Sequence, residues 1–374
     1  MPFTAWQIFT GAAVMAASLA AAGHAVLHKR DVRAAIGWVA VILLTPGFGA
    51  AAYFLFGVNR IRRRALAMGP GGLRARPAEP LSPVHLPGAS VHLDRVARLG
   101  DKVVRNPLVP GARVTLLPSG AETYPAMLAA IDAAQRSVTL STYIFDRGTV
   151  GDAFVEALTR ARWRGVQVRV LVDAVGARYA WPPVHAALRR NDVPVALFLP
   201  RISAWLLPSL NLRNHRKILV ADGRVGFTGG FNIRDEFAAS PTNPAPHQDL
   251  HLRVEGPLVA QLQAAFAEDW RFATGEELDG VEFFPGLESP GTVLGRAIPD
   301  GPDEDFETIR WLLFGALGAA RSSIRIVTPY FLPEPALVLA LDAAALRGVE
   351  VDIVLPERSN LPVVAWAQTA QLWQ

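Results

Sequence analysis

The chain has 374 residues, of which 51% are hydrophobic, and a formal net charge of +4 at pH 7. The mean hydropathy of +0.24 suggests membrane segments, and the isoelectric point near 9.7 suits an anionic partner, either a lipid surface or a nucleic acid. The sequence contains no cysteine, which excludes disulfides, thiolate chemistry and cysteine-based metal sites.

The first sixty residues predict a transmembrane hairpin, domain 1–64, with spans at about 4–27 and 34–58. Residues 34–58 carry no charged side chain and are long enough to cross about 30 Å of hydrocarbon, although Pro46 and Gly47 should bend them. A cleaved signal peptide is the alternative for the first span, which however lacks a basic amino-terminal region.

Basic residues around the spans predict the orientation of the hairpin. The positive-inside rule favours a cytoplasmic catalytic part, because the second span is followed by Arg60, Arg62, Arg63, Arg64, Arg74 and Arg76. The link at 29–33 is also basic, which weakens this inference. We therefore expect a multi-pass membrane protein whose catalytic part faces the cytoplasm.

The rest of the chain predicts an α/β fold with a mostly buried sheet, because strands alternate with helices. Residues 65–112 are rich in proline, glycine and arginine and are expected to form a linker. A first lobe is predicted at 113–275, with strands at 114–117, 138–145 and 168–173 and helices at about 122–134 and 150–164. A second linker, 276–306, then leads into a partial second lobe at 307–374.

The pattern recurs along the chain. Residues 131–138 resemble 317–324, residues 143–145 match 330–332, and residues 164–168 resemble 347–351, so two related α/β units follow each other. The offsets of 183 and 187 residues place an equivalent of His215 at about 398–402, beyond Gln374. We expect the chain to be a carboxy-terminal truncation of a longer protein. A natural half-site protein that pairs two copies, and an inactive scaffold, are the alternatives.

The pattern His-x-Lys-x4-Asp, formed by His215, Lys217 and Asp222, carries the predicted chemistry. Residues 218–220 are an apolar run typical of a buried strand, and residues two apart on a strand share a face. His215 and Lys217 should therefore project together, so that a neutral imidazole attacks phosphorus while an ammonium holds the phosphate oxygens. The chain has only three lysines among 37 Lys and Arg residues, which makes a chance lysine here less credible.

Neighbouring residues suit an anion site. Gly230 should bring a backbone amide towards the anion, and Asn232 should act as a neutral donor. Arg213 and Arg216 flank the motif and are expected to meet phosphate groups, although a generic basic rim is as good an explanation. Asp222 is expected to fix the turn and the geometry of the motif rather than carry a proton.

The sequence resembles the phospholipase D superfamily, and within it the bacterial cardiolipin synthases, from about Val32 to Gln374. The segments that carry this resemblance are Asn-His-Arg-Lys-Ile at 214–218, Phe-Thr-Gly-Gly-Phe-Asn-Ile at 227–233, Leu-Arg-Val-Glu-Gly-Pro at 252–257 and Thr-Pro-Tyr-Phe-Leu-Pro at 328–333. The resemblance implies a phospholipase D-like mixed sheet flanked by helices, and catalytic roles for His215, Lys217 and Asp222. It also places a supporting acid at Asp249, with Asp235 and Glu236 as rivals.

The implied activity is transfer of a phosphatidyl group between two phosphatidylglycerol molecules through a phosphohistidine, giving cardiolipin and glycerol. The alternatives are a hydrolytic phospholipase D, in which water replaces the second lipid, and an inactive membrane-bound fragment. The expected partners are phosphatidylglycerol, other anionic phospholipids, the bacterial inner membrane and a second copy of the chain. No nucleic acid is expected, since no aromatic-basic stripe supports binding. No cofactor is expected, and no acidic cluster indicates a metal site.

Overall fold

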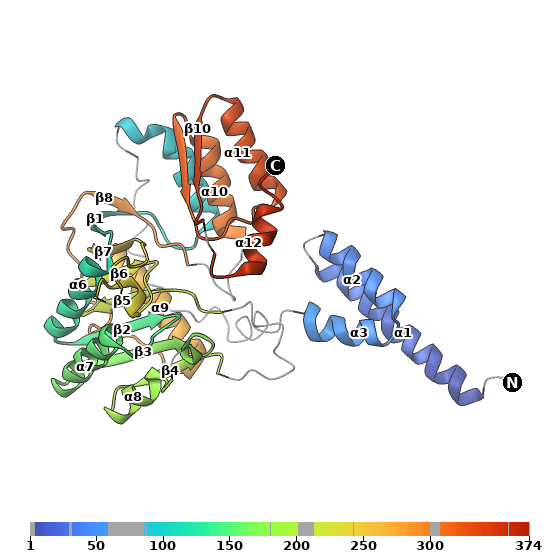
Figure 1. Cartoon of the computed structure of the whole chain (residues 1–374), viewed down its shortest axis with the longest axis horizontal. Coiled ribbons are helices and arrows are strands. Elements are labelled where there is room, and N and C mark those ends of the chain that lie inside the picture. The colour runs from blue at the N-terminus through green and yellow to red at the C-terminus, as the bar shows by residue number, and fades with distance from the viewer. Residues whose placement is uncertain are drawn as a thin grey trace. The chain divides into compact units, whose positions relative to one another are not determined.

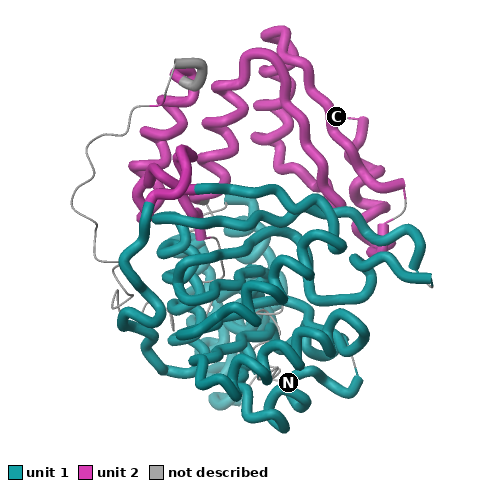
Figure 2. Tube along the Cα trace, turned by 90° about the vertical axis from the view of Figure 1, so that its left-hand side faces the viewer, with its two compact units in different colours: residues 1–76, 113–288, 301–304 teal, residues 77–112, 289–300, 305–374 magenta. Residues whose placement is uncertain are grey.

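The computed structural model describes residues 4–29, 32–58, 86, 88–179, 181–200, 213–241, 243–299, 307–357 and 359–373. The chain divides into two compact units, which Figure 2 colours separately. The first comprises residues 1–76, 113–288 and 301–304, and the second comprises residues 77–112, 289–300 and 305–374. Both contain strands and helices, as the alternating sequence pattern predicted.

The amino-terminal helices differ from the predicted pair of spans. Helix α1 (Ala5–His28) begins at a capping box formed by Thr4 and Gln7 and matches the first span. The second span is not one helix: α2 (Val32–Leu44) ends before Pro46, and the chain turns before α3 (Phe48–Ala52) and the π-helical turn η1 (Tyr53–Gly57) (Figure 1). Proline lacks the N–H that would continue α2, and Gly47 adopts a φ of +81°. Within the described residues, α1 alone has the length and composition to cross a membrane.

The first lobe is built on a mixed sheet with the strand order β4-β3-β2-β5-β6-β7-β1-β8. Its strands β2, β3 and β4 are parallel, and the pairings from β2 through β5, β6, β7 and β1 to β8 are antiparallel. The bounds are β1 Val109–Leu117, β2 Ser137–Thr142, β3 Gln167–Asp173, β4 Val195–Phe198, β5 Ile218–Ala221, β6 Val225–Gly229, β7 His251–Glu255 and β8 Val293–Gly295. This arrangement confirms the mixed sheet that the resemblance implied.

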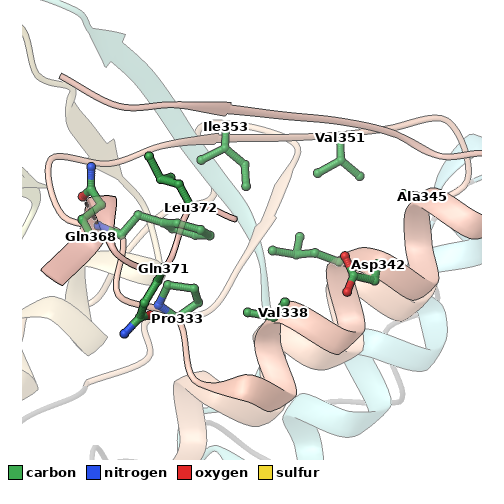
Figure 3. A pocket seen from close by; sticks show the side chains of 11 residues that line it. Pro333, Val338, Asp342, Ala345, Val351, Ile353, Gln368, Gln371 and Leu372 are labelled. Carbon is green, nitrogen blue, oxygen red and sulfur yellow. Dashed lines mark hydrogen bonds between the residues drawn. The ribbon is translucent and has the colours of Figure 1, made fainter. Parts of the chain in front are cut away.

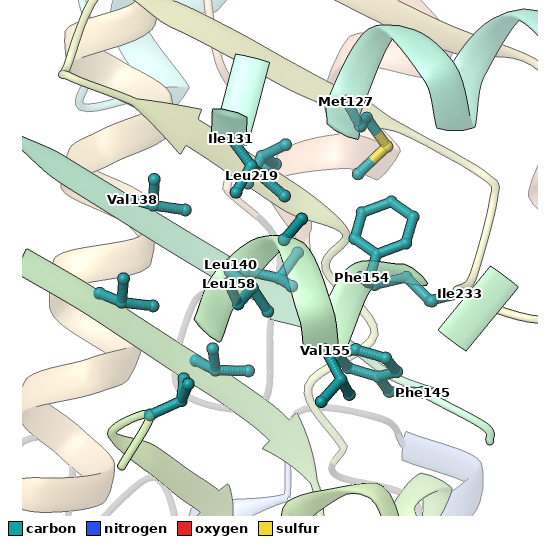
Figure 4. Packing of buried hydrophobic residues seen from close by; sticks show 14 of the residues in the cluster. Met127, Ile131, Val138, Leu140, Phe145, Phe154, Val155, Leu158, Leu219 and Ile233 are labelled. Carbon is teal, nitrogen blue, oxygen red and sulfur yellow. The ribbon is translucent and has the colours of Figure 1, made fainter. Parts of the chain in front are cut away.

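Helices cover both faces of this sheet. Helices α6 (Gly120–Ala133), α7 (Thr149–Trp163) and α8 (Val184–Arg190) share a core with the apolar side chains of β2 and β3. Figure 4 shows Ile131 of α6 and Phe154 of α7 packed over strand residues such as Leu140. On the other face, Thr139 donates a hydrogen bond to Gln263 of α9 (Leu258–Thr274) at 2.9 Å. Burial of both faces explains why every residue of β2 is buried.

The second unit is a smaller α/β assembly. Strands β9 (Ser323–Val327) and β10 (Glu350–Val354) pair in parallel and are connected by α11 (Pro335–Leu346). Helices α10 (Glu307–Ala319) and α12 (Pro362–Thr369) complete the order helix, strand, helix, strand, helix. The core contains Leu317, Ile324, Leu341, Ala344 and Val349.

Part of the predicted linker at 65–112 is regular structure. The 3-10 helix η2 (Gly88–Leu93) leads into α5 (Asp94–Val103), which packs against α10 in the second unit. Gly315 of α10 lies against the side chain of Leu99, which explains how these helices approach closely. The proline-rich composition of the region concealed this short amphipathic helix, whose Asp94 and Arg98 pair one turn apart.

The second unit also contains a cavity of about 250 Å³ (Figure 3). Its lining comes from β10, α11, α12 and the segments beside them: Phe331, Pro333, Val338, Leu341, Asp342, Ala345, Val351, Ile353, Gln368, Gln371 and Leu372. Most of these side chains are apolar, and the lining holds no histidine or lysine. The cavity therefore carries none of the predicted chemistry.

Candidate active site

His215 and Lys217 lie together at the start of β5, as the motif predicted. The Lys217 Nζ atom is 3.2 Å from His215 Nδ1 and donates a hydrogen bond to the His215 carbonyl at 2.9 Å. His215 is exposed, whereas Lys217 is buried, with 7% of its surface accessible. Tyr143, which follows β2, packs against the imidazole with ring centroids 4.5 Å apart. The site thus presents one accessible imidazole backed by a buried ammonium.

Two buried carboxylates fix the segment that carries His215. Asp173, at the end of β3, accepts a hydrogen bond from the Asn214 backbone N–H at 3.2 Å. Asp269 of α9 accepts from the Asn214 side-chain amide at 2.8 Å and pairs with Arg216 at 2.6 Å. Both acids were missed in the sequence, since they lie 41 and 55 residues from Asn214. Asp173 is a charged residue at the end of the apolar strand β3, and this position was the one sequence feature that could have marked it as a site residue.

The environment lowers the pKa of both motif residues. Desolvation against the protein, followed by the charge of Lys217, lowers the pKa of His215 to about 4. Burial lowers the pKa of Lys217 to about 8, although the charge of Asp249 opposes this shift. At neutral pH the histidine is therefore neutral and the lysine is still largely protonated. This is the combination that nucleophilic attack on a phosphodiester needs.

Asp249 lies beside the site without a hydrogen bond to His215 in the described structure. Its Oδ1 accepts from the Leu250 N–H at 2.7 Å, and its carboxylate lies so close to Gly230 that a Cβ there would overlap it. Lys217 instead faces His215 Nδ1. The predicted acid is thus near the lysine, which it influences electrostatically, rather than behind the imidazole.

Two of the predicted phosphate ligands have other partners. The Gly230 N–H donates to the Leu250 carbonyl at 2.9 Å, which uses the amide that was expected to bind an anion. The side chain of Arg213 is 8% exposed and lies 3.8 Å from Asp173. Both residues therefore support the site from inside the lobe. The pairing of β6 with β7 brings the Gly230 N–H to the Leu250 carbonyl, and this pairing could not be predicted from the sequence.

Asn232 is half-buried and is held by contacts on both its side chain and its backbone. Its Oδ1 accepts a hydrogen bond from the Ile144 N–H at 3.2 Å, which orients the side-chain amide. Its own carbonyl accepts from the Tyr124 hydroxyl at 2.6 Å. The segment that follows β6 is thereby tied to the end of β2, beside Tyr143.

Asp222 lies at the opposite end of β5 from His215. The β5 register pairs Ala221 with Val138 at the start of β2, and Ile218 with Ser141 near its end. The Asp222 carboxylate accepts hydrogen bonds from the backbone N–H groups of Gln135, Arg136 and Ser137 at 2.7–3.1 Å. Asp222 was predicted to be part of the catalytic motif, but its hydrogen bonds anchor β5 to the start of β2, at the far end of the strand from His215.

The rival acids are also engaged elsewhere. Asp235 accepts from the N–H groups of Thr149 and Val150 at 3.0 and 2.8 Å, at the amino terminus of α7. Glu236 pairs with Arg234 at 2.9 Å. Asp235 therefore caps a helix, which is a structural role that favours negative charge at that end.

The sequence analysis missed His251, the first residue of β7. It is 1% exposed, and neither ring nitrogen has a hydrogen-bond partner among the described residues. Desolvation, and then the charge of Lys217, lower its pKa to about 4. A buried imidazole without partners is costly, so His251 is a residue whose presence calls for a functional reason. Its position next to the conspicuous Asp249 was the only signal in the sequence.

The described residues contain no group of three or more His, Asp or Glu side chains arranged to hold a metal ion. The chemistry of the site must be judged from His215, Lys217 and the donors around them. These groups can form and break a bond to phosphorus and neutralise the charge of its oxygens.

The fold and the His-Lys pair define a phospholipase D-like lobe. The family profile described as "Cardiolipin synthase, PLD-like domain" matches residues 127–270 and 313–374. A second profile, "Phospholipase_D-nuclease N-terminal", matches residues 16–57. The chain therefore belongs to the cardiolipin synthase family of phospholipase D-like proteins.

Individual relatives agree. The chain is 31% identical to cardiolipin synthase 1 of Bacillus cereus, over 89% of this chain and 68% of that protein. It is 33% identical to cardiolipin synthase A of Pseudomonas entomophila, over 92% of this chain and 73% of that protein. In fold it is similar to phosphatidylserine synthase of Haemophilus influenzae, with a TM-score of 0.50, 12% identity, and coverage of 70% of this chain and 66% of that one.

Proposed function

We propose that this protein transfers a phosphatidyl group from one phosphatidylglycerol to another, giving cardiolipin and glycerol. The observation that carries the proposal is the exposed His215, whose Nδ1 lies 3.2 Å from the Nζ atom of the buried Lys217. Membership of the cardiolipin synthase family supplies the substrate class. A protonated histidine could not attack phosphorus, and the lowered pKa of His215 removes that obstacle.

In the first step a nitrogen of His215 forms a bond to phosphorus, and the bond from phosphorus to the glycerol oxygen breaks. Lys217 neutralises charge on the phosphate oxygens as the transition state forms. The Asn232 amide, oriented by Ile144, donates to a phosphate oxygen. In the second step a hydroxyl of the second lipid attacks the phosphohistidine, which restores His215.

The leaving alkoxide needs a proton, and the incoming hydroxyl must lose one. The sequence holds one His-x-Lys-x4-Asp pattern, so the general acid and base need a second such motif. We propose that a second copy of the chain supplies it through its own His215, or that a longer form of the protein supplies it from its second lobe. The roles of Asp222 as strand anchor and of Asp249 as the carboxylate beside Lys217 complete the proposed site.

We further propose that the protein is attached to the bacterial inner membrane through α1, with the catalytic part facing the cytoplasm. Helix α1 is long and apolar enough to cross, and basic residues follow the helical region. We keep the predicted division into a membrane region at 1–64 and lobes at 113–275 and 307–374, with the connecting segments 65–112 and 276–306 containing η2, α5, the start of β1 and β8.

The test is product analysis in membranes that make no cardiolipin of their own. The chain is expressed there with deuterated phosphatidylglycerol, and the lipids are separated by mass. If a second copy of the chain supplies the second motif, we expect labelled cardiolipin and glycerol, abolished in His215→Ala but retained in His185→Ala, which removes a histidine of α8 outside the site. Labelled phosphatidic acid instead would identify a hydrolase. No product, while the Pseudomonas entomophila relative yields cardiolipin in the same membranes, would show that this chain does not complete the reaction.

A further inference from the structure

The amino-terminal helices pack in a way that two full membrane spans would not. The buried residues of α1 are Ser18, Ala21, Ala22 and Ala25, all in its second half. Its first half exposes large apolar side chains, including Trp6 and Phe9 at 72% and 67%. Helices α2 and α3 therefore cover only the second half of α1.

The direction of the chain follows from two hydrogen bonds. Ser18, near the middle of α1, accepts from the Gly47 N–H at 3.0 Å, which places the turn between α2 and α3 at mid-helix. His24, one turn before the end of α1, lies 2.7 Å from the Tyr53 hydroxyl in η1. The chain thus runs from the end of α1 along α2 to its middle, and returns along α3 and η1 to the same end.

The lengths agree with this path. At 1.5 Å per residue, the 24 residues of α1 span about 36 Å, enough for the roughly 30 Å hydrocarbon core. The 13 residues of α2 span only about 20 Å, and the ten residues of α3 and η1 about 15 Å. Neither arm can cross alone, but each can reach about the middle of a bilayer.

Polar groups at the turn between α2 and α3 form hydrogen bonds within the protein. A break in a helix exposes backbone polar groups, which lipid cannot satisfy. Here Ser18, which is fully buried, takes the Gly47 N–H, and the Thr45 hydroxyl donates to the Val41 carbonyl at 2.7 Å. A Cβ at Gly49 would overlap the Val41 carbonyl, so glycine permits the two arms to approach.

We propose that α1 crosses the bilayer once, whereas residues 32–57 enter it to about mid-depth and return to the same face. This path puts the basic link, with Lys29, Arg30 and Arg33, on the same side as the basic run that begins at Arg60. Two full spans would put these basic segments on opposite faces, against the positive-inside rule. On the proposed path the basic segments share the cytoplasmic face with the catalytic part, and the start of α1 lies on the outer face.

Single-cysteine labelling tests this topology, because these 374 residues contain no cysteine that would have to be removed. Thr4→Cys, Val32→Cys, Val58→Cys and Trp163→Cys report the start of α1, the two ends of the half-depth hairpin and helix α7. A membrane-impermeant maleimide is applied to spheroplasts and to inverted vesicles. We expect Thr4→Cys to react only in spheroplasts, and the other three only in inverted vesicles.

Each other pattern overturns the proposal. If Val32→Cys reacts from one face and Val58→Cys from the other, residues 34–58 form a full span. If all four positions react from one face, the helices lie on the surface without crossing. Denaturing detergent, in which all four variants must label, confirms that each cysteine is reactive. None of these outcomes depends on catalysis, so the result is separate from the proposed function.

Discussion

The two α/β repeats of this protein share their order of elements and their strand pairing but differ in what covers them. In the first, α6, β2, α7 and β3 follow one another; in the second, α10, β9, α11 and β10 do the same. Ser137 pairs with Gln167 at the start of β2 and β3, and Ser323 pairs with Glu350 at the start of β9 and β10. The repeated sequence pattern therefore corresponds to a repeated order of elements and a repeated strand pairing.

Burial separates the two repeats. Every residue of β2 is buried, whereas Ile324 is the one buried residue of β9 and Val327 is 80% exposed. In the first lobe the antiparallel strands β5, β6 and β7 extend the sheet, and α9 covers its second face. His215 and Lys217 lie in the segment that leads into β5, and Asp269, which binds Asn214, lies in α9. The elements that cover the first repeat are thus also those that position His215 and Lys217.

The largest expected effect is on the free energy of local unfolding when equivalent core residues of the two repeats are truncated. Ile131 of α6 is fully buried, and its equivalent Leu317 of α10 is 7% exposed in a smaller core. Ile131→Ala should lower the free energy of local unfolding around β2 by about 4 kcal/mol, because a well-packed core cannot collapse into the cavity. Leu317→Ala should lower it around β9 by about 2 kcal/mol, since a shallow core relaxes more easily.

Hydrogen exchange of the solubilised full chain, read separately in β2 and β9 peptides, measures both losses. The wild-type protein should already show slower exchange in β2 than in β9. Equal losses in the two variants would mean that the difference in burial has no energetic consequence.

The next prediction concerns Asp222, which ties β5 to the start of β2. Asp222→Ala removes four hydrogen bonds to backbone N–H groups and leaves alanine at a φ of +53°, so we expect a loss of about 3 kcal/mol. Asp222→Asn keeps an acceptor and tolerates that φ, and should lose about 1 kcal/mol. Thermal unfolding with lipid turnover at two temperatures measures this. Loss of turnover in a fully folded Asp222→Asn protein would point to a direct catalytic role instead.

The third prediction is the pH dependence of transfer. Activity should rise as His215 loses its proton near pH 4 and fall about tenfold per pH unit above pH 8, as Lys217 becomes neutral. Lys217→Arg should remove the alkaline decline, because guanidinium stays protonated, at some cost in rate. An unchanged alkaline limb in Lys217→Arg would assign that limb to another group.

The same shift affects stability on the acid side. The pKa of His215 is lower in the folded protein than its usual 6.5. The unfolded chain therefore binds the proton more readily between about pH 4 and 6.5, and the contribution of His215 to stability is lost as the pH falls through this window. His215→Ala should flatten the acid side of the unfolding profile.

Sequence patterns predicted those features of the fold and the site that depend on residues close together in the chain. The shared side of His215 and Lys217, the buried strand that follows them, and the repeat at residues 317–324 are all confirmed. The clamps Asp173 and Asp269 and the buried His251 depend on how distant elements meet, which spacing does not encode.

Hydropathy likewise predicted one long membrane span at 34–58, where the structure has two shorter helical segments. Residues 34–58 are apolar throughout, so a hydropathy window does not register the break at Pro46 and Gly47. The break is stabilised by Ser18, which belongs to another helix, and this tertiary contact is absent from any local window.

The smallest expected effect tests whether the repeats are equivalent where their local contacts match. Arg164 donates to the Ile131 carbonyl at 2.9 Å, and Arg347 donates to the Leu317 carbonyl at 3.1 Å. Arg164→Ala removes the bond to Ile131 and a longer one to the Ala134 carbonyl at 3.3 Å, whereas Arg347→Ala removes the bond to Leu317. Each substitution should lower the local unfolding free energy by about 1 kcal/mol, because the longer bond adds little. Hydrogen exchange at the end of α6 and of α10 measures the two losses. A loss several times larger at Arg164 would mean that the cover of the first lobe strengthens even this local contact, so that the repeats are equivalent in geometry but not in energy.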